Sequence, residues 1–319
     1  MTRGISIVIP TYNRAPMLEP TLASMARLNV PRGVDVEILV VDNNCTDDTH
    51  RVVTDFKATA PFPVKHILEH EQGQSASRNR GFRDATFDHV VDFDDDVNVY
   101  VDWIAGYFDA VDHFEADCVV GPVYPVFEVQ VPAYLTKSVL DLISSPYSRK
   151  GGQAMLLPQS VAHEVPGCNF GVRRDVALAV GAFDNSWGRN RASAVMISQD
   201  DFDFGRRLVA AGKRVVYEPR CAIHHRLSSE KLSRTYLRRR WYGEGATKRQ
   251  VDAQSGSRPS LAQRARYLGG AIHRATRAVT CYAAGRTALA FQWELEARQA
   301  LGYIFHKPHL TPNHGDGTT

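Results

Sequence analysis

Four aspartates lie within five positions of the chain, directly after an apolar run: Asp92, Asp94, Asp95 and Asp96. Carboxylates this close repel one another and raise each other's pKa unless a positive charge lies between them. Their oxygens are hard ligands that suit Mg²⁺ or Mn²⁺. Because Mg²⁺ usually binds one or two carboxylates together with substrate phosphate, the Asp94-x-Asp96 spacing suggests a diphosphate held through a metal ion. A solvated acidic turn is the alternative, since aspartate also favours local backbone hydrogen bonds.

An acidic segment and a histidine pair occur much later in the sequence. The acids are Asp200, Asp201 and Asp203, and the pair is His224 and His225. Considered alone, the acids suit the first turn of a helix, where the helix dipole favours negative charge. Considered alone, the histidines suit the end of a strand without a ligand. Neither group indicates a site without further context.

The elements that would position these residues alternate between strands and helices. Apolar, β-branched runs predict buried strands, and periodic segments between them predict helices. The expected strands are 5–10, 36–42, 64–70 and 89–94, and the expected helices are 17–28, 46–56 (with Thr46 as N-cap) and 75–85. Continuous apolar strands that alternate with helices are typical of a parallel sheet covered on both faces. The first half therefore predicts an α/β fold with a Rossmann-like, nucleotide-binding sheet.

Three polar motifs follow three of these predicted strands. They are PTYNR (10–14), DNNCTD (42–47) and DFDDD (92–96). In open α/β sheets, ligands bind at the carboxyl ends of the strands. The three motifs are therefore expected to meet at one edge and to form one site.

The second half is less regular and becomes basic. We expect a strand over 118–127, a helix over 133–144 and a helix over 198–212 with Ser198 before its acidic first turn. From about Leu232 the chain is predicted to be helical. The predicted organisation is a catalytic domain (1–228), a helical C-terminal region (229–308) and a disordered tail (309–319).

Composition places the chain among ordinary globular enzymes. It has 319 residues, 44% apolar and 23% charged, with a net charge of +3. Its five dispersed cysteines predict reduced thiols, not a disulfide framework. The N-terminal segment does not resemble a signal peptide, and no apolar run is long enough for a membrane span. We therefore expect a cytoplasmic protein, with association at the cytoplasmic face of a membrane left open.

Seven short motifs, in this order and spacing, resemble the family 2 glycosyltransferases of the GT-A fold. They are ISIVIPTYNR, EILVVDNNCTDDT, GQSASRNRGFRDA, FDDDV, GCNFGVRRDVALAVGAFD, QDDFDFGRRL and YEPRCAIHHR. The resemblance covers about residues 4–245. It implies an inverting, bacterial-type hexosyltransferase that moves a sugar from a nucleoside-diphosphate donor to a hydroxyl acceptor with Mn²⁺ or Mg²⁺.

The resemblance also implies a role for each matched residue. Nucleotide contacts are expected from Pro10, Thr11, Tyr12, Arg14, Asp42, Asn44, Arg78, Asn79, Asp94 and Asp95. Asp96 is expected to bind the metal with Asp94 and a histidine, with His225 favoured over His224. Asp201 is the expected base, but Asp200 stays open because relatives usually have Glu-Asp at this pair. Cys45 replaces a usual serine and removes a hydrogen-bonding hydroxyl.

The implied chemistry is consistent with these residue types. A hydroxyl that attacks an anomeric carbon needs a base, and a buried carboxylate with a raised pKa can serve. The leaving diphosphate needs its developing charge neutralised, which a metal ion provides. Displacement in one step, without a covalent intermediate, inverts the anomeric centre.

Other readings of the sequence are an aspartate-dependent phosphatase, a sugar-phosphate nucleotidyltransferase and a catalytically inactive nucleotide-sugar binder. The phosphatase pattern requires Thr or Val where Asp96 stands, and the nucleotidyltransferase requires a glycine-rich basic loop before Tyr12. UDP- or dTDP-sugars are the favoured donors, with GDP left open, and the acceptor is a glycan, a lipid-linked sugar or a small molecule.

The basic part of the chain is compatible with several partners. Residues 206–252 hold 13 Lys or Arg against 4 Asp or Glu. Such a region can contact an anionic membrane, form a homodimer interface or dock on the catalytic domain. No nucleic-acid-binding motif accompanies the charge, so nucleic acid is not an expected partner.

Overall fold

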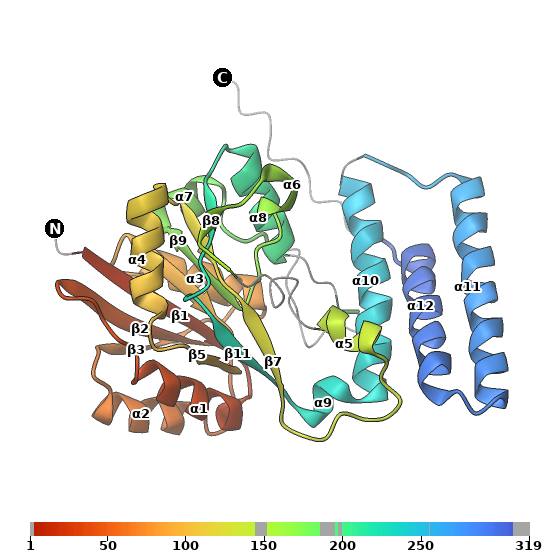
Figure 1. The fold of residues 1–319 in the computed structure, drawn as a ribbon, viewed down its shortest axis with the longest axis horizontal. Helices are drawn as coiled ribbons and strands as arrows, with labels where there is room; N and C mark the ends of the chain where they lie inside the picture. The colour runs from red at the N-terminus through yellow and green to blue at the C-terminus, as the bar shows by residue number, and fades with distance from the viewer. Residues whose placement is uncertain (1–2, 144–151, 186–194, 197–199, 255, 309–319) are drawn as a thin grey trace. The chain divides into compact units, whose positions relative to one another are not determined.

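The computed structural model describes residues 3–143, 152–185, 195–196, 200–254 and 256–308 (Figure 1). The expected Ser198 cap and the tail 309–319 lie outside this part of the chain. Contacts between Cα atoms divide the chain into two units. The first contains the strands, and the second contains the C-terminal helices together with residues 129–140. The predicted boundary at residue 228 stays a prediction.

An eight-stranded sheet forms the centre of the first unit in the described part of the chain. In spatial order its strands are β3 (Val64–Leu68), β2 (Val34–Asp42), β1 (Arg3–Thr11), β4 (His89–Phe93), β9 (Asn169–Arg173), β6 (Cys118–Val120), β10 (Val215–Tyr217) and β8 (Met155–Leu156). The strands β3, β2, β1 and β4 are parallel, as predicted. Beyond β4, where the sequence predicts no strand direction, β9 runs antiparallel to both of its neighbours, β10 runs parallel to β6, and β8 runs antiparallel to β10. Where strands and helices do not alternate regularly, an apolar run predicts burial but not strand direction.

A second, three-stranded sheet connects the aspartate turn to the histidine pair. Its strands are β5 (Val97–Val99), β11 (Ile223–Leu227) and β7 (Val123–Phe127). The antiparallel register places His225 opposite Val97, the residue that follows Asp96. The expected strand over 118–127 is in fact two strands, β6 and β7, which belong to different sheets.

Helices cover both faces of the main sheet, as the α/β interpretation predicts. On one face lie α1 (Ala15–Met25), α2 (Thr49–Thr59) and α4 (Trp103–Phe114); on the other lie α3 (Gln74–Asp84), α6 (Gln159–Ala162), α7 (Arg174–Ala179) and α8 (Asp200–Ala210). The expected Thr46 cap of α2 is wrong. The residue before the helix is Asp48, and the Thr46 amide donates instead to Asn13 Oδ1 at 2.7 Å.

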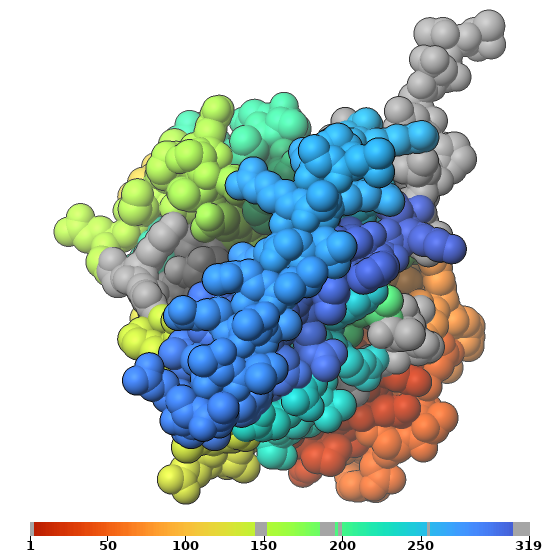
Figure 2. Space-filling model, turned by 90° about the vertical axis from the view of Figure 1, so that its right-hand side faces the viewer, coloured from red at the N-terminus to blue at the C-terminus, as the bar shows by residue number. Residues whose placement is uncertain are grey.

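The second unit is dominated by three long helices joined by short connections. Its helices are α9 (Ser229–Leu232), α10 (Arg234–Gln254), α11 (Leu261–Ala283) and α12 (Thr287–Phe305), while α5 (Lys137–Ile143) begins in this unit. Helix α12 packs against both α10 and α11, and Figure 2 shows α11 and α12 as two neighbouring blue bands. Gly285, with a left-handed φ of 70°, separates α11 from α12. Within the described residues, no helix has the length and apolar character that a membrane crossing requires.

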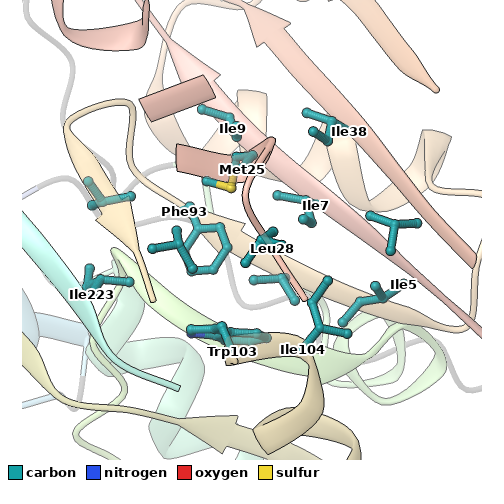
Figure 3. Close-up of a cluster of buried hydrophobic side chains, with 14 of the residues drawn as sticks. Ile5, Ile7, Ile9, Met25, Leu28, Ile38, Phe93, Trp103, Ile104 and Ile223 are labelled. Carbon is teal, nitrogen blue, oxygen red and sulfur yellow. The ribbon is translucent and has the colours of Figure 1, made fainter. Parts of the chain in front are cut away.

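Almost every side chain of β1 is buried, and successive side chains point to opposite faces of the sheet. Ile5, Ile7 and Ile9 join the core beneath α1 and α4, which Figure 3 shows together with Met25 and Trp103. The side chain of Val8 joins the other core, beneath α3 and α8. Two apolar cores therefore fix the sheet from both sides and leave its carboxyl edge to the polar motifs.

Candidate active site

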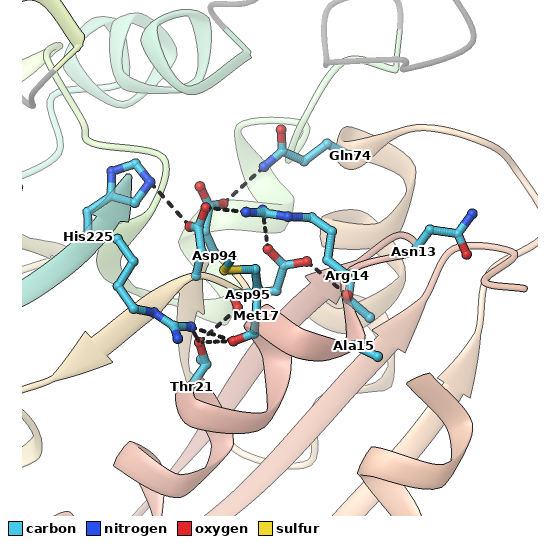
Figure 4. A network of polar contacts seen from close by, with 12 residues as sticks. Asn13, Arg14, Ala15, Met17, Thr21, Gln74, Asp94, Asp95 and His225 are labelled. Atoms are coloured by element: carbon cyan, nitrogen blue, oxygen red, sulfur yellow. Dashed lines mark hydrogen bonds and ion pairs between the residues drawn. The ribbon is translucent and has the colours of Figure 1, made fainter. Parts of the chain in front are cut away.

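The turn after β4 directs successive aspartates to different partners (Figure 4). Asp95 is 4% exposed, and its carboxylate accepts a hydrogen bond from the Thr11 hydroxyl at 2.8 Å. Its other oxygen pairs with the Arg14 guanidinium. Because Thr11 ends β1, Asp95 attaches the aspartate turn to the neighbouring strand.

Arg14 bridges two carboxylates of this turn. Its Nη2 lies 2.6 Å from Asp96 Oδ2, while its Nη1 contacts Asp95. Burial alone would lower the pKa of Arg14, but the two carboxylates outweigh it and hold that pKa above its ordinary value. Burial raises the pKa of Asp95 to about 6 against the effect of Arg14, and repulsion from Asp96 and Asp94 adds to the rise. One guanidinium therefore does not neutralise this cluster.

Asp94, Asp96 and His225 form a group that could hold a divalent cation. Each offers one ligand atom, and these atoms lie within 4.8 Å of one another. His225 Nε2 is 3.2 Å from Asp96 Oδ1, and Asp96 is completely buried. Two carboxylates and an imidazole suit Mn²⁺ or Mg²⁺, and the surplus of negative charge favours a cation. The donor set therefore fits the expected metal.

His224 lies away from this group. Successive side chains of a strand point to opposite faces, so β11 can direct only one of the two histidines toward the aspartates. His224 Nε2 is instead 3.1 Å from the Tyr100 hydroxyl, and its ring contacts the rings of Tyr100 and Tyr124. Of the two sequence candidates, His225 is the one with ligand geometry.

Arg78 is a buried hub between distant segments. Only 2% of it is exposed, and it contacts Asp92 at 2.8 Å, Asp200 at 2.7 Å and the carbonyl oxygen of Gly167. A longer contact of 3.4 Å reaches Asp94. Burial raises the pKa of Asp92 to about 7, although Arg78 opposes the change. The Arg78 guanidinium donates to acceptors of the protein itself. This geometry favours a role in positioning the carboxylates and not a contact with a phosphate of the donor.

Asp200 and Asp201 occupy the first turn of α8 in different environments. Asp200 is 4% exposed, and its Oδ2 accepts from Arg78 and from the Ser75 hydroxyl. Asp201 is half-buried, and its Oδ2 accepts from the Gly167 amide at 3.1 Å. The Asp200 carboxylate is thus buried against Arg78 and Ser75, whereas Asp201 is more exposed to solvent. The geometry therefore favours Asp201 as the base.

Asp42 ends β2 with both of its oxygens engaged. Oδ1 accepts from the Cys45 amide at 2.7 Å, and Oδ2 lies 3.0 Å from His66 Nε2. Burial alone would raise the pKa of Asp42, but His66 and the Cys45 amide outweigh it and keep that pKa below its ordinary value. Burial raises the pKa of the Cys45 thiol to about 11. Asp42 is therefore a charged acceptor in a fixed orientation, beside a neutral thiol.

The remaining sequence candidates lie near the same edge with different surroundings. Pro10 is buried within β1, and Tyr12 is half-buried just after the strand. Asn44 has a left-handed φ of 64°, and its amide donates to the His70 carbonyl at 3.1 Å. Asn79 donates to the Phe183 carbonyl at 2.6 Å and accepts from the Phe183 amide. The geometry gives Asn44 and Asn79 roles in loop structure.

Three residues that support the site were not identified from the sequence. Gln74 Nε2 donates to Asp94 Oδ1 at 3.0 Å, and the Thr21 hydroxyl donates to the Asp95 carbonyl at 2.8 Å. Arg226 donates to the Thr21 hydroxyl at 2.9 Å. Gln74 and Arg226 lie inside motifs that were singled out, but only the fold shows what they contact.

A sequence model described as Glycosyl transferase family 2 matches residues 6–181, more than half of the chain. The chain belongs to this family. The transferase is 26% identical over 250 residues to the succinoglycan biosynthesis protein ExoM of Rhizobium meliloti, covering 77% of this chain and 74% of that protein. It is 27% identical over 252 residues to a glucosyl-dolichyl phosphate glucuronosyltransferase of Haloferax volcanii. The match covers 78% of this chain and 77% of that protein.

Solved structures confirm the GT-A fold of the transferase. The mannosyltransferase PcManGT from Pyrobaculum calidifontis, in complex with GDP-Man and Mn²⁺, matches with a TM-score of 0.61 and 18% identity over 94% of this chain and 85% of that chain. S. aureus TarS 1-349 in complex with UDP-GlcNAc matches with a TM-score of 0.55 and 16% identity. This match covers 95% of this chain and 93% of that chain. The family and the fold predicted from the seven motifs are confirmed.

Proposed function

We propose that this glycosyltransferase transfers a sugar from a nucleoside-diphosphate donor to a hydroxyl acceptor, with a divalent cation and with inversion at the anomeric carbon. The observation that carries the proposal is the grouping of Asp94, Asp96 and His225 within 4.8 Å of one another. All three belong to the first unit, as does Asp201. Cation ligands and a candidate base thus occur within a single compact unit.

The nucleotide end of the site is assigned to the first two polar motifs. Asp42 is held by His66 and the Cys45 amide in a charged form that can accept a hydrogen bond from the N–H of a base. A carboxylate has about four lone-pair positions, so its two present partners leave acceptor capacity. Uracil, thymine and guanine all carry an N–H of this kind. UDP- and dTDP-sugars are the favoured donors, and GDP-sugars are the alternative.

A divalent ion would be held by Asp96, Asp94 and His225. When bound, such an ion neutralises charge on the departing diphosphate. Arg14 contacts Asp96 from the side of β1, and Gln74 contacts Asp94 from the side of α3. These contacts keep the two carboxylates in place, which is what supporting residues around a metal site do.

Asp201 is the proposed general base. It accepts a proton from the acceptor hydroxyl as the oxygen attacks the anomeric carbon and the bond to the diphosphate breaks. Asp200 is held by Arg78 and Ser75, so its role is to fix the start of α8. One base is assigned, and no side chain is assigned as a nucleophile. This set of roles corresponds to a single displacement, which inverts the anomeric centre.

The acceptor is proposed to be a hydroxyl of a glycan, a lipid-linked sugar or a small molecule. The names of the relatives refer to succinoglycan biosynthesis and to a glucosyl-dolichyl phosphate, so they include a polysaccharide and a lipid-linked substrate.

The test is a screen of UDP-, dTDP- and GDP-sugars with the full chain, in Mn²⁺, Mg²⁺ or EDTA. We expect nucleotide release with one base class and a loss of turnover in EDTA. Asp96→Asn should remove the stimulation by Mn²⁺, while Asp55→Asn, at a surface helix position, should keep it. NMR of the transferred sugar should show inversion. Turnover that is unchanged in EDTA would contradict the metal, and retention would contradict the single displacement.

A further inference from the structure

Helix α11 carries an apolar stripe that faces solvent. Leu261, Leu268, Ile272, Val279 and Tyr282 are 85%, 43%, 59%, 68% and 38% exposed. They follow one another at intervals of seven, four, seven and three residues, so they lie on one face of the helix. Single exposed apolar residues are ordinary, but a continuous row of five along one helix indicates a surface that binds something.

The stripe is not the face by which α11 packs within its unit. Ala271, Ala278 and Cys281 are the buried residues of α11, and they lie on another side of the helix. That side contacts α12, which also packs against α10. Figure 2 shows the side chains of α11 in mid-blue beside the darker band of α12. The helix therefore has one face for its own unit and a second apolar face beyond it.

The charge on α11 is entirely positive. It contains four arginines and no Asp or Glu. Two of them face α12, since Arg274 lies 3.5 Å from Glu296 and Arg277 lies over the Trp293 ring. Arg264 and Arg266 are exposed, as is Arg286 just after the helix. None of these three makes an ion pair within the described residues, so their charge is available to an external anion.

We propose that α11 binds the surface of an anionic lipid bilayer. The helix would lie parallel to the membrane, with its apolar stripe between lipid headgroups and acyl chains and with Arg264, which lies beside the stripe, at lipid phosphates. The proposal rests on the proposed function only for its purpose, since a lipid-linked acceptor would be held at such a surface. The binding itself does not depend on catalysis.

Charge and shape favour a bilayer over other occupants. A second copy of α11 packed on this stripe would bring arginine against arginine, with no acidic residue on the helix to compensate. Nucleic acid would pair with the arginines but would not bury Leu, Ile and Val side chains. A spanning orientation conflicts with the four charged residues of the helix. An acidic lipid surface meets both the apolar and the charge requirement.

The test is co-sedimentation of the full chain with vesicles of phosphatidylcholine, with and without about one-third phosphatidylserine. We expect binding to the anionic vesicles that weakens in high salt, because exposed charges are screened. The double variant Ile272→Ser/Val279→Ser should reduce the partition coefficient by about tenfold or more, since it removes two large apolar side chains from the buried face. Arg264→Gln should reduce the preference for anionic over neutral vesicles.

A matched control changes two exposed leucines of other helices. Leu142→Ser/Leu178→Ser removes aliphatic surface at positions that are 53% and 41% exposed, and it should bind vesicles like the wild type. Circular dichroism and donor hydrolysis should be the same for all variants, which separates this proposal from the proposed catalysis. Equal sedimentation with and without anionic lipid would overturn the proposal. So would a dimer in velocity sedimentation that Ile272→Ser/Val279→Ser dissociates, together with no vesicle binding.

Discussion

Glu37 and Asp95 are equally buried, each at 4% exposed, but their surroundings differ in kind. Glu37, on β2, accepts from the Ser6 hydroxyl and the Thr86 amide and pairs with Lys65. Burial alone would raise the pKa of Glu37, but these partners outweigh it and hold that pKa below its ordinary value. Asp95 has two partners and neighbouring carboxylates, and its pKa is raised to about 6.

The difference separates a structural carboxylate from one that belongs to a site. Glu37 is stabilised as an anion by the protein itself, so it ties together β1, β2 and the segment before β4. At the carboxyl edge, five aspartates meet two guanidinium groups, those of Arg14 and Arg78. That edge has more negative charge than the chain neutralises, which is the condition under which a cation is bound.

The largest effect is expected for the base. Asp201→Asn keeps the size of the side chain but cannot accept a proton, so the transfer rate should fall by about 10²–10⁴ with donor affinity unchanged. Single-turnover kinetics and nucleotide titration measure the two quantities. The control is Asp203→Asn two positions along α8, whose carboxylate pairs with Arg207 and should be dispensable for transfer. If Asp200→Asn slows transfer more than Asp201→Asn, the base is assigned to the wrong residue.

Asp96→Asn tests the surplus of charge directly. It should weaken Mn²⁺ binding by about 10- to 100-fold or more, by analogy with lost support around metal sites. In EDTA it should leave the free energy of unfolding unchanged or higher, because it removes one of several mutually repelling carboxylates. Calorimetry with Mn²⁺ and urea denaturation in EDTA provide both readings. A strong loss of stability in EDTA would make Asp96 a structural residue like Glu37.

Glu37→Gln should have the opposite pattern. Transfer should be unaffected, while the free energy of unfolding should fall by about 1–3 kcal/mol, since a buried charged hydrogen-bond network is lost. Because the pKa of Glu37 is lower in the folded than in the unfolded chain, this stabilisation is present above the unfolded pKa. It is lost as the pH falls through the folded pKa. Urea denaturation at pH 7 and pH 3 should therefore show a smaller difference between wild type and variant in acid.

The smallest effect is expected at the nucleotide end. His66→Gln removes the imidazole contact to Asp42 and should weaken nucleotide affinity by about two- to tenfold, the range for one hydrogen bond. Calorimetry with the preferred nucleoside diphosphate measures it. His50→Gln is the control, since His50 touches the His66 ring and does not contact Asp42 in the described structure. Equal effects of both changes would show that the aromatic contact, and not the hydrogen bond, matters.

The sequence was sufficient for the parts of this site that depend on local order. The parallel strands β1 to β4 and the polar motifs at their ends follow from short-range patterns and motif order. The preference for His225 over His224 came from the family resemblance and stays a prediction. The role of Arg78 could not be predicted in this way. Its partner Asp200 lies on α8, 122 positions away, and only the packing of α3 and α8 on the same face brings the two together. The direction of the strands after β4 could not be predicted either, because burial determines which residues a strand contains and not the direction in which it runs.

The pairing of β5 with β11 determines when, during synthesis and folding, the chain becomes able to bind the cation. Asp94 and Asp96 leave the ribosome long before His225, so the first strands can assemble while the aspartates still lack their histidine. A slip of one residue in this register would present His224 in place of His225. A chain that stops before β11, or pairs it wrongly, should keep much of its sheet but bind the cation poorly. Cation affinity would thus report that synthesis and strand pairing are complete.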